Sequence, residues 1–260
     1  MLLKLIACEI FTREICYCVA RSPHRVDLEF TDIGAHENSD TLRTILQERI
    51  DRASKNKKNY DAVLLCYGLC GNATVNLTAR KTRLVIPRAH DCCTLFLGSK
   101  KKFQKYFGNN PSRPFYATGC CEREYDNFSR RVNIPGAPVE NFESYVKRYG
   151  QENAEYLWDI LHQKEKEPGD MIFIQIQETA RLGYAEKCRV AAAADGKKYI
   201  ELPGDIRLIK NLVFGNWKNE DFLVVQPFHR TTGVYDWDEI IRAKKLSSHE
   251  HMVTDPHSNP

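Results

Sequence analysis

The sequence predicts an α/β fold built from parallel sheets, in Rossmann- or flavodoxin-like lobes with helices on both faces. Short apolar runs rich in Val, Ile and Leu recur along the chain, and each is closed by a turn-forming segment, which is the pattern of buried strands. Segments with helical periodicity separate these runs, as in βαβ units. The chain has 260 residues, of which 42% are hydrophobic and 28% charged, so it can bury a large core.

The first half of the chain alternates strands and helices. The predicted strands cover residues 2–10, 26–33, 62–65, 84–86 and 114–118, and the predicted helices cover 12–20, 40–53, 73–79 and 94–107. The strand over 26–33 alternates apolar and polar side chains, which is typical of a strand near a sheet edge. Ser39 or Asp40 is available to cap the helix over 40–53.

The second half repeats this alternation after a polar stretch with Gly and Pro between Cys121 and Pro138. Helices are predicted over 139–163, 179–194 and 205–214, and strands over 171–176, 198–202 and 222–225. We therefore expect an N-terminal lobe of residues 1–135, a C-terminal lobe of residues 136–243 and a disordered tail of residues 244–260.

Charge and hydropathy exclude several classes of partner. The net charge of +4 is small, and no basic stripe with interleaved aromatic residues is present, so we expect no nucleic-acid binding. No apolar run approaches the ~18 residues of a membrane span. The apolar start of the chain, Met1–Cys8, is too short for a signal peptide and follows no basic segment. We therefore expect a cytoplasmic protein without a membrane partner.

Ten cysteines are the most informative feature of the composition, because in a cytosolic protein of this size they favour metal binding or catalysis over disulfides. Seven of them follow predicted strands: Cys8, Cys66, Cys70, Cys92, Cys93, Cys120 and Cys121. The carboxyl ends of parallel strands share one edge of a sheet, so these thiols can converge although they are distant in sequence. Thiolates are ligands for iron–sulfur clusters and zinc.

A simpler interpretation is that buried cysteines act as small hydrophobic residues. We adopt it for Cys16, Cys18 and Cys188, which lie on predicted helices, and keep it open for Cys66 at the end of a strand. The spacing from Cys66 to Cys70 is not that of a zinc ribbon and is weak evidence alone.

The segment after the strand over 84–86 adds other chemical groups. His90, Asp91 and Cys92 combine an imidazole, a carboxylate and a thiol, which is the composition of a thiol nucleophile with its base, although neighbours in sequence seldom face each other. Arg88 can bind an anionic group or form a structural ion pair. Within this site His90 is a candidate metal ligand or acid–base catalyst, and Asp91 is a further catalytic candidate.

Residues after the other strands complete the candidate site. Gly71 and Asn72 permit positive φ angles and a close approach of the backbone to a substrate or anion. Glu9 is a further catalytic candidate at the end of the first strand, whereas Glu14 is expected to cap a helix or lie on the surface. No Gly-x-Gly-x-x-Gly fingerprint and no Gly-Lys-Ser/Thr phosphate loop occurs, so common nucleotide binding is unsupported.

Several motifs together resemble a known family. They are Tyr-Gly-Leu-Cys-Gly-Asn at 67–72, Ile-Pro-Arg-Ala-His-Asp-Cys at 86–92, Leu-Gly-Ser at 97–99, Ala-Cys-Glu at 7–9 and Gly-Asn-Trp-x-x-x-Asp-Phe-Leu-Val-Val at 215–225. With these motifs most of residues 1–228 resembles the family called domain of unknown function 1638. The resemblance implies no established activity, but it implies an association with anaerobic microbes and with corrinoid-dependent methyltransferase systems.

The resemblance also sorts the candidate residues. Those that match the motif positions are Cys8, Glu9, Cys70, Arg88, His90, Asp91 and Cys92, whereas Cys66, Cys93, Cys120 and Cys121 are additional in this sequence. If the additional thiols are ligands, this chain holds a cluster that its relatives lack.

The leading functional prediction is a metal- or iron–sulfur-dependent protein of anaerobic one-carbon or corrinoid methyl-transfer metabolism. Its site would hold an iron–sulfur cluster or zinc and take a small-molecule or cofactor ligand, and a corrinoid would come from a corrinoid protein or methyltransferase partner. Two alternatives stay open. One is a non-catalytic accessory protein that binds a corrinoid or a methyltransferase, and the other is a cofactor-free Cys/His thiol enzyme.

Overall fold

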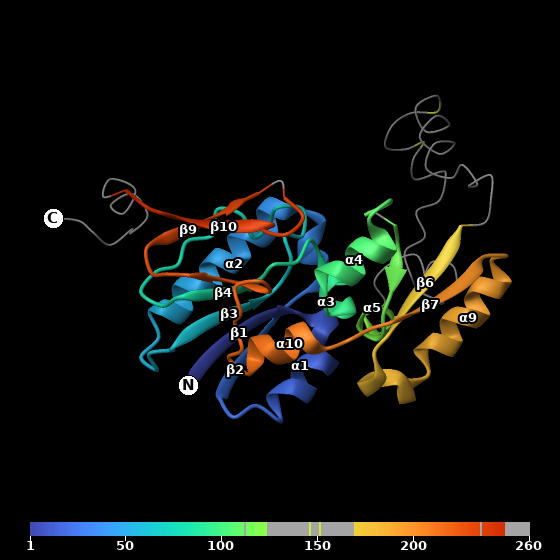
Figure 1. Ribbon diagram of the computed structural model, residues 1–260, viewed down its shortest axis with the longest axis horizontal. Helices are drawn as coiled ribbons and strands as arrows, with labels where there is room; N and C mark the ends of the chain where they lie inside the picture. Colours follow the sequence, from blue (N-terminus) through green and yellow to red (C-terminus); the bar gives the residue numbers. More distant parts are fainter. Residues whose placement is uncertain (112, 124–145, 147–150, 152–168, 235, 248–260) are drawn as a thin grey trace.

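A computed structural model describes residues 1–111, 113–123, 146, 151, 169–234 and 236–247 (Figure 1). Two mostly parallel sheets organise these residues, which confirms the predicted α/β class. The larger sheet has the strand order β2-β1-β3-β4-β8 and the smaller one the order β5-β6-β7, and a separate hairpin joins β9 and β10.

The element bounds agree with most of the predicted segments. The strands are β1 (Leu2–Cys8), β2 (Arg25–Thr31), β3 (Ala62–Cys66), β4 (Leu84–Pro87), β5 (Phe115–Tyr116), β6 (Asp170–Gln175), β7 (Lys198–Pro203), β8 (Phe222–Val225), β9 (His229–Gly233) and β10 (Ile241–Lys245). The α-helices are α1 (Thr12–Val19), α2 (Ser39–Ser54), α3 (Cys92–Leu97), α4 (Lys100–Phe107), α5 (Thr118–Glu122), α9 (Tyr184–Ala194) and α10 (Arg207–Val213). Short 3-10 helices are η1 (Glu9–Phe11), η2 (Ile33–Glu37) and η3 (Gln177–Leu182).

Burial explains the strand order of the larger sheet. Every residue of β3 and β4 is buried, and these continuous apolar strands lie in the interior of the sheet. The strand β2, whose side chains alternate, lies at the edge, as predicted. The strands β1 to β4 pair with one another in parallel, whereas β8 pairs antiparallel with β4.

Strand pairing crosses the expected lobe boundary. The boundary at 135/136 itself lies outside the described residues. The strand β5 precedes it but pairs with β6, and β8 follows it but completes the larger sheet. At the other end of the expected C-terminal lobe, Lys244 and Lys245 belong to β10, and residues 248–260 lie outside the description.

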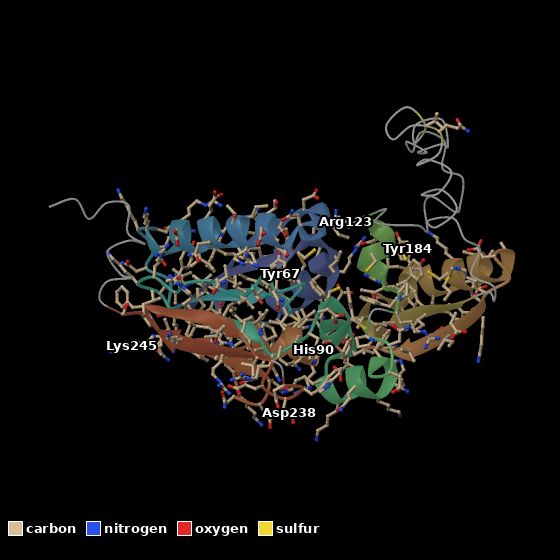
Figure 2. All side chains as sticks on the ribbon, turned by 90° about the horizontal axis from the view of Figure 1, so that it is seen from above. Tyr67, His90, Arg123, Tyr184, Asp238 and Lys245 are labelled. Atoms are coloured by element: carbon tan, nitrogen blue, oxygen red, sulfur yellow. The ribbon has the colours of Figure 1, made fainter. Side chains whose placement is uncertain are left out.

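Helices cover both faces of the larger sheet. The helix α2 buries Leu42, Leu46 and Ile50 along one stripe, and Asn38 caps it in place of Ser39 or Asp40 by accepting hydrogen bonds from two backbone N–H groups. Right-handed crossovers place α1 and α2 on opposite faces. The helix α10 packs on α1, and Figure 2 shows α2 along one side of the molecule and the β9–β10 hairpin along the other.

Two predicted helices are wrong because of backbone conformation. Residues 73–76 form turns and Thr78 forms an isolated β-bridge with Arg230, since positive φ angles at Gly71, Asn72 and Asn76 prevent a helix from forming there. The helix predicted over 94–107 is two helices, because Gly98 adopts φ +70° at the end of α3 and Ser99 then caps α4.

The helix predicted over 139–163 lies outside the described residues. Among the helices that the structure does describe, none combines the length and the hydrophobicity that crossing a membrane requires.

Candidate functional site

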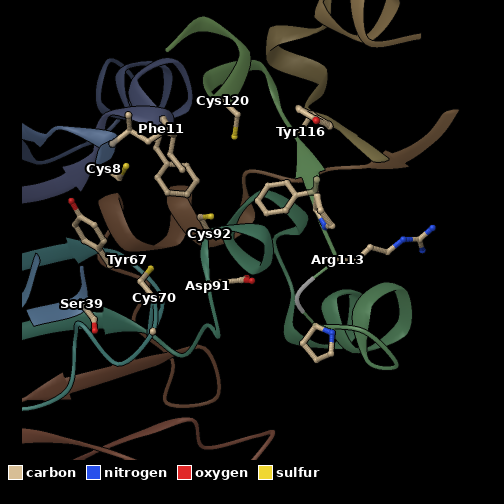
Figure 3. A pocket seen from close by; sticks show the side chains of 17 residues that line it. Cys8, Phe11, Ser39, Tyr67, Cys70, Asp91, Cys92, Arg113, Tyr116 and Cys120 are labelled. Atoms are coloured by element: carbon tan, nitrogen blue, oxygen red, sulfur yellow. The ribbon is translucent and has the colours of Figure 1, made fainter. Parts of the chain in front are cut away.

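A cavity of about 510 Å³ opens where β1, β3 and β4 end, between the larger sheet and the segment of β5 and α5 (Figure 3). Four thiols from four separate segments line it, and we call it the thiol cavity. They belong to Cys8, Cys70, Cys92 and Cys120, and Figure 3 shows them around one common space. The structure thus brings together four of the seven predicted cysteines. The wall of the cavity is largely apolar and includes four aromatic residues, Phe11, Tyr67, Phe115 and Tyr116.

Backbone contact between two loops positions Cys70. The loop after β3 lies against the loop after β4, with Leu69 N–H donating to the Ala89 carbonyl at 2.9 Å and Cys70 N–H donating to the His90 carbonyl at 3.2 Å. Gly68 makes this approach possible, since a Cβ there would lie 2.6 Å from the backbone nitrogen of Asp91. Cys70 itself has a φ of +45°.

Two short helices, α3 and α5, position Cys92 and Cys120. Cys92 begins α3, which Asp91 caps by accepting a hydrogen bond from Thr94 N–H at 3.1 Å. Cys120 lies on α5, which sits directly on η1, since a Cβ on Gly119 would lie 1.6 Å from the carbonyl oxygen of Ile10. The helix α5 follows β5 of the three-stranded sheet, and its backbone contact with η1 places Cys120 at the cavity.

The electrostatics of the thiol cavity oppose thiolates in the protein alone. Burial raises the pKa of Cys8 to about 11 and the pKa values of Cys70 and Cys120 to about 12, and raises the pKa of Cys92 well above its usual value. The nearby Asp91 carboxyl also raises the pKa of Cys70 and Cys92, although burial raises the pKa of that carboxyl as well.

Positive charge is scarce at this cavity. Among its described lining residues Arg113 is the one basic side chain, and it pairs with Asp170 and extends away from the cavity in Figure 3. The described lining therefore offers sulfur donors and a carboxyl group, and Arg123, which lowers the pKa of Cys8, does not outweigh the effect of burial.

The other three predicted cysteines lie outside the thiol cavity. Cys66 and Cys93 are fully buried in the main core, and burial raises the pKa of both thiols. The Cys121 sulfur lies 3.8 Å from the sulfur of Cys188 on α9.

The two predicted backbone-approach residues also separate. Gly71 lines the thiol cavity with a φ of +64°. Asn72 is not among the described lining residues, and its carbonyl accepts a hydrogen bond from Arg43 at 2.9 Å.

His90 faces an aromatic cluster and is absent from the described lining of the cavity. Its ring stacks on Phe103 with centroids 5.4 Å apart and meets Trp237 edge-on at 4.6 Å. Its buried Nε2 atom has no hydrogen-bond partner among the described residues. Burial, helped by Lys100, lowers its pKa. Figure 2 shows His90 between Tyr67 and Asp238, on the side of the hairpin connection.

Arg88 binds backbone of residues 219–241 from the C-terminal part of the chain. Its buried guanidinium donates to the carbonyl and side chain of Asn219 at 2.8 and 3.1 Å and to the carbonyl of Glu239 at 2.7 Å, and it also reaches the carbonyl of Ile241. These contacts give Arg88 a structural role, and its predicted binding of an anion stays a prediction.

Glu9 holds neighbouring backbone in place. Its carboxylate accepts a hydrogen bond from Ile33 N–H at 2.9 Å and pairs with Arg123 at 3.6 Å. It is absent from the described lining of the thiol cavity, so no contact supports the predicted catalytic role.

Sequence reasoning missed Glu14, whose predicted capping or surface role is wrong. Its side chain is fully buried on α1, and neither carboxyl oxygen has a hydrogen-bond partner among the described residues. The signal was present in the spacing, because Phe11, Ile15 and Cys18 form the apolar stripe of this segment and Glu14 falls on the same stripe. Burial raises its pKa to about 7.

Neither the grouping of ligating side chains nor comparisons with known proteins assign a function to this site. In the described part of the chain, no three His, Cys, Asp or Glu side chains are grouped so that they could hold one metal ion. No curated protein matches the chain, and no solved structure matches it. The family model described as a protein of unknown function (DUF1638) matches residues 30–213, which is more than half of the sequence. The chain therefore belongs to the DUF1638 family.

Proposed function

We propose that this protein is an iron–sulfur protein whose cluster is held in the thiol cavity by Cys8, Cys70, Cys92 and Cys120. The observation that carries the proposal is the convergence of four thiols from four segments on one cavity. A cluster bound there would supply one-electron redox chemistry, with a potential tuned by burial and by contacts to its sulfurs.

The chemistry of the donors supports a soft, positively charged centre. Cysteine thiolates are the ligands of iron–sulfur clusters, and a bound metal keeps a coordinating thiol deprotonated. Without such a centre, burial keeps these thiols protonated, because their pKa values are raised to about 11 or higher. The apolar wall would keep water away from the cluster.

The spread of the thiols favours a cluster over a single zinc ion. Zinc–sulfur bonds of about 2.3 Å hold four thiolates about 3.8 Å from one another. Among the described residues no three ligating side chains are grouped so that they could hold one metal ion, although four thiols line one cavity. In a four-iron cluster each cysteine binds a different iron atom, so wider separations between the cysteine sulfurs are accommodated.

The cofactor-free thiol enzyme has less support. A cysteine nucleophile needs a depressed pKa and a base within reach. Here burial raises the pKa of Cys92, and the ring of His90 contacts Phe103 and Trp237. The corrinoid, the methyltransferase partner, the one-carbon pathway and the cytoplasmic location stay predictions.

The test is anaerobic purification followed by a visible absorption spectrum and by quantification of iron, sulfide and zinc on the same sample. We expect a broad brown absorption with matching iron and sulfide. Cys8→Ser, Cys70→Ser, Cys92→Ser and Cys120→Ser should each lower cluster content, whereas the exposed Cys16→Ser should retain it.

A second control tests whether any substitution next to a proposed ligand disturbs the cluster. Cys93→Ser changes the residue next to Cys92 but outside the thiol cavity, so it should retain the cluster if circular dichroism shows a folded chain. Stoichiometric zinc without sulfide would contradict the cluster. A folded chain without metal would overturn the proposal and favour the non-catalytic accessory protein.

A further inference from the structure

A second pair of thiols lies apart from the thiol cavity. The sulfur atoms of Cys121 on α5 and Cys188 on α9 are 3.8 Å apart, although the residues are 67 positions apart in sequence. Successive side chains on a helix point about 100° apart. This turn separates Cys120, which lines the cavity, from Cys121, which faces α9.

The surroundings of this pair are compact. Cys188 is fully buried in the small core of the three-stranded sheet, together with Tyr116, Met171 and Phe173. Cys121 packs against the same core and is half-buried, whereas Cys188 beside it is fully buried, so a reagent would reach Cys121 first.

We propose that Cys121 and Cys188 form a reversible disulfide by exchange with a small-molecule disulfide. A disulfide bond is about 2.05 Å long, so the sulfurs need to approach by about 2 Å. The contact with Cys188 and burial raise the pKa of Cys121, so this thiol must first lose its proton to the solvent. The Cys121 sulfur then attacks the small disulfide, forming a mixed disulfide and releasing one thiol, which takes up a proton. The Cys188 thiolate then attacks the Cys121 sulfur and releases the second thiol. The two protein thiols are oxidised and the small disulfide is reduced to two thiols.

The bond would fasten α5 to α9 next to a residue of the thiol cavity. The helix α5, which carries Cys121, already packs on η1 through the close backbone approach at Gly119. The modified cysteine therefore lies on a tightly packed helix. This inference does not depend on a metal, because neither Cys121 nor Cys188 is among the described residues that line the cavity.

The experiment treats the reduced full-length chain with increasing oxidised glutathione under anaerobic conditions, then alkylates the remaining thiols and maps the peptides by mass spectrometry. We expect a cross-linked peptide pair that contains Cys121 and Cys188, and both cysteines should become at least tenfold less accessible to alkylation. Dithiothreitol should reverse the change.

Variants and neighbours assign the bond. Cys188→Ser should abolish the cross-link and leave glutathione attached to Cys121, whereas Cys16→Ser should retain the cross-link. The peptide map of the unmodified sequence keeps the test valid if a variant fails to fold. A cross-link through Cys120, or none under conditions that modify the exposed Cys16, would overturn the proposal.

Discussion

The buried carboxyl group of Glu14 should make the stability of this protein fall as pH rises. Burial is the main cause that raises its pKa from the ordinary 4.5 to about 7, and the neighbouring Glu122 and Glu178 add to this effect. Its side chain is fully buried, so solvent does not screen these interactions.

The sign and size follow from proton binding. Unfolded chains release the proton near pH 4.5, whereas the folded chain keeps it until about pH 7, so the folded state binds more protons between these values. Stability from this group is therefore complete below pH 4.5 and is lost as pH rises to about 7. At 1.36 kcal/mol for each pH unit, the loss is about 3 kcal/mol.

Glu14→Gln isolates this contribution, because glutamine does not ionise. Urea unfolding of both proteins between about pH 4.5 and pH 8 gives the difference in the free energy of unfolding, which should shift in favour of the variant by about 3 kcal/mol and level off above pH 7. Glu48→Gln removes an exposed carboxylate of α2 and serves as the matched control for the loss of a charge. A difference for Glu14→Gln that is constant across this range would refute the reasoning.

Two further predictions concern the contacts that build the fold around the site. Arg88→Ala should lower the free energy of unfolding by at least about 3 kcal/mol, because buried carbonyl groups lose a charged donor. The control Lys101→Ala changes an exposed side chain and should alter the free energy of unfolding little. A loss below about 1 kcal/mol for Arg88→Ala would contradict the structural role of Arg88. Gly119→Ala should lower the free energy of unfolding by about 3 kcal/mol in a urea assay, because the added Cβ would overlap the carbonyl oxygen of Ile10. At Gly196 a Cβ would meet open space and only the φ of +66° is unfavourable, so Gly196→Ala should lower it by about 1 kcal/mol. Equal costs for the two glycines would show that α5 does not rest on η1 as described.

The burial of individual strands could be predicted from the sequence, although their order could not. The continuous apolar runs of β3 and β4 indicated buried strands, and the alternation of β2 indicated a strand near an edge. The convergence of thiols followed from the shared edge of parallel strands. The pairing of β8 with β4 could not be predicted, because an antiparallel strand that returns from a distant segment has the same local pattern as a parallel one.

Side-chain direction was the other limit. Cys92 and Cys93 are adjacent on one helix, and so are Cys120 and Cys121, and only the rotation of the helix decides which sulfur reaches the cavity. Arg88 binds Asn219, and one of the two aromatic partners of His90 is Trp237; both partners lie more than 100 residues away in sequence, so no local signal could reveal them.

Two glycines explain why this cavity can hold four thiols from separate segments. At Gly68 and Gly119 a side chain would collide with backbone atoms, 2.6 Å from the nitrogen of Asp91 and 1.6 Å from the carbonyl oxygen of Ile10. Backbone contact fixes positions more tightly than side-chain packing does, because the main chain has few alternative conformations within a packed core. One glycine aligns the loops that carry Cys70 and Cys92, and the other seats the helix that carries Cys120 against η1, directly after Cys8. The geometry of the thiol cavity therefore depends on residues that contribute no donor atom, and their replacement should displace the thiols even when all four cysteines are present.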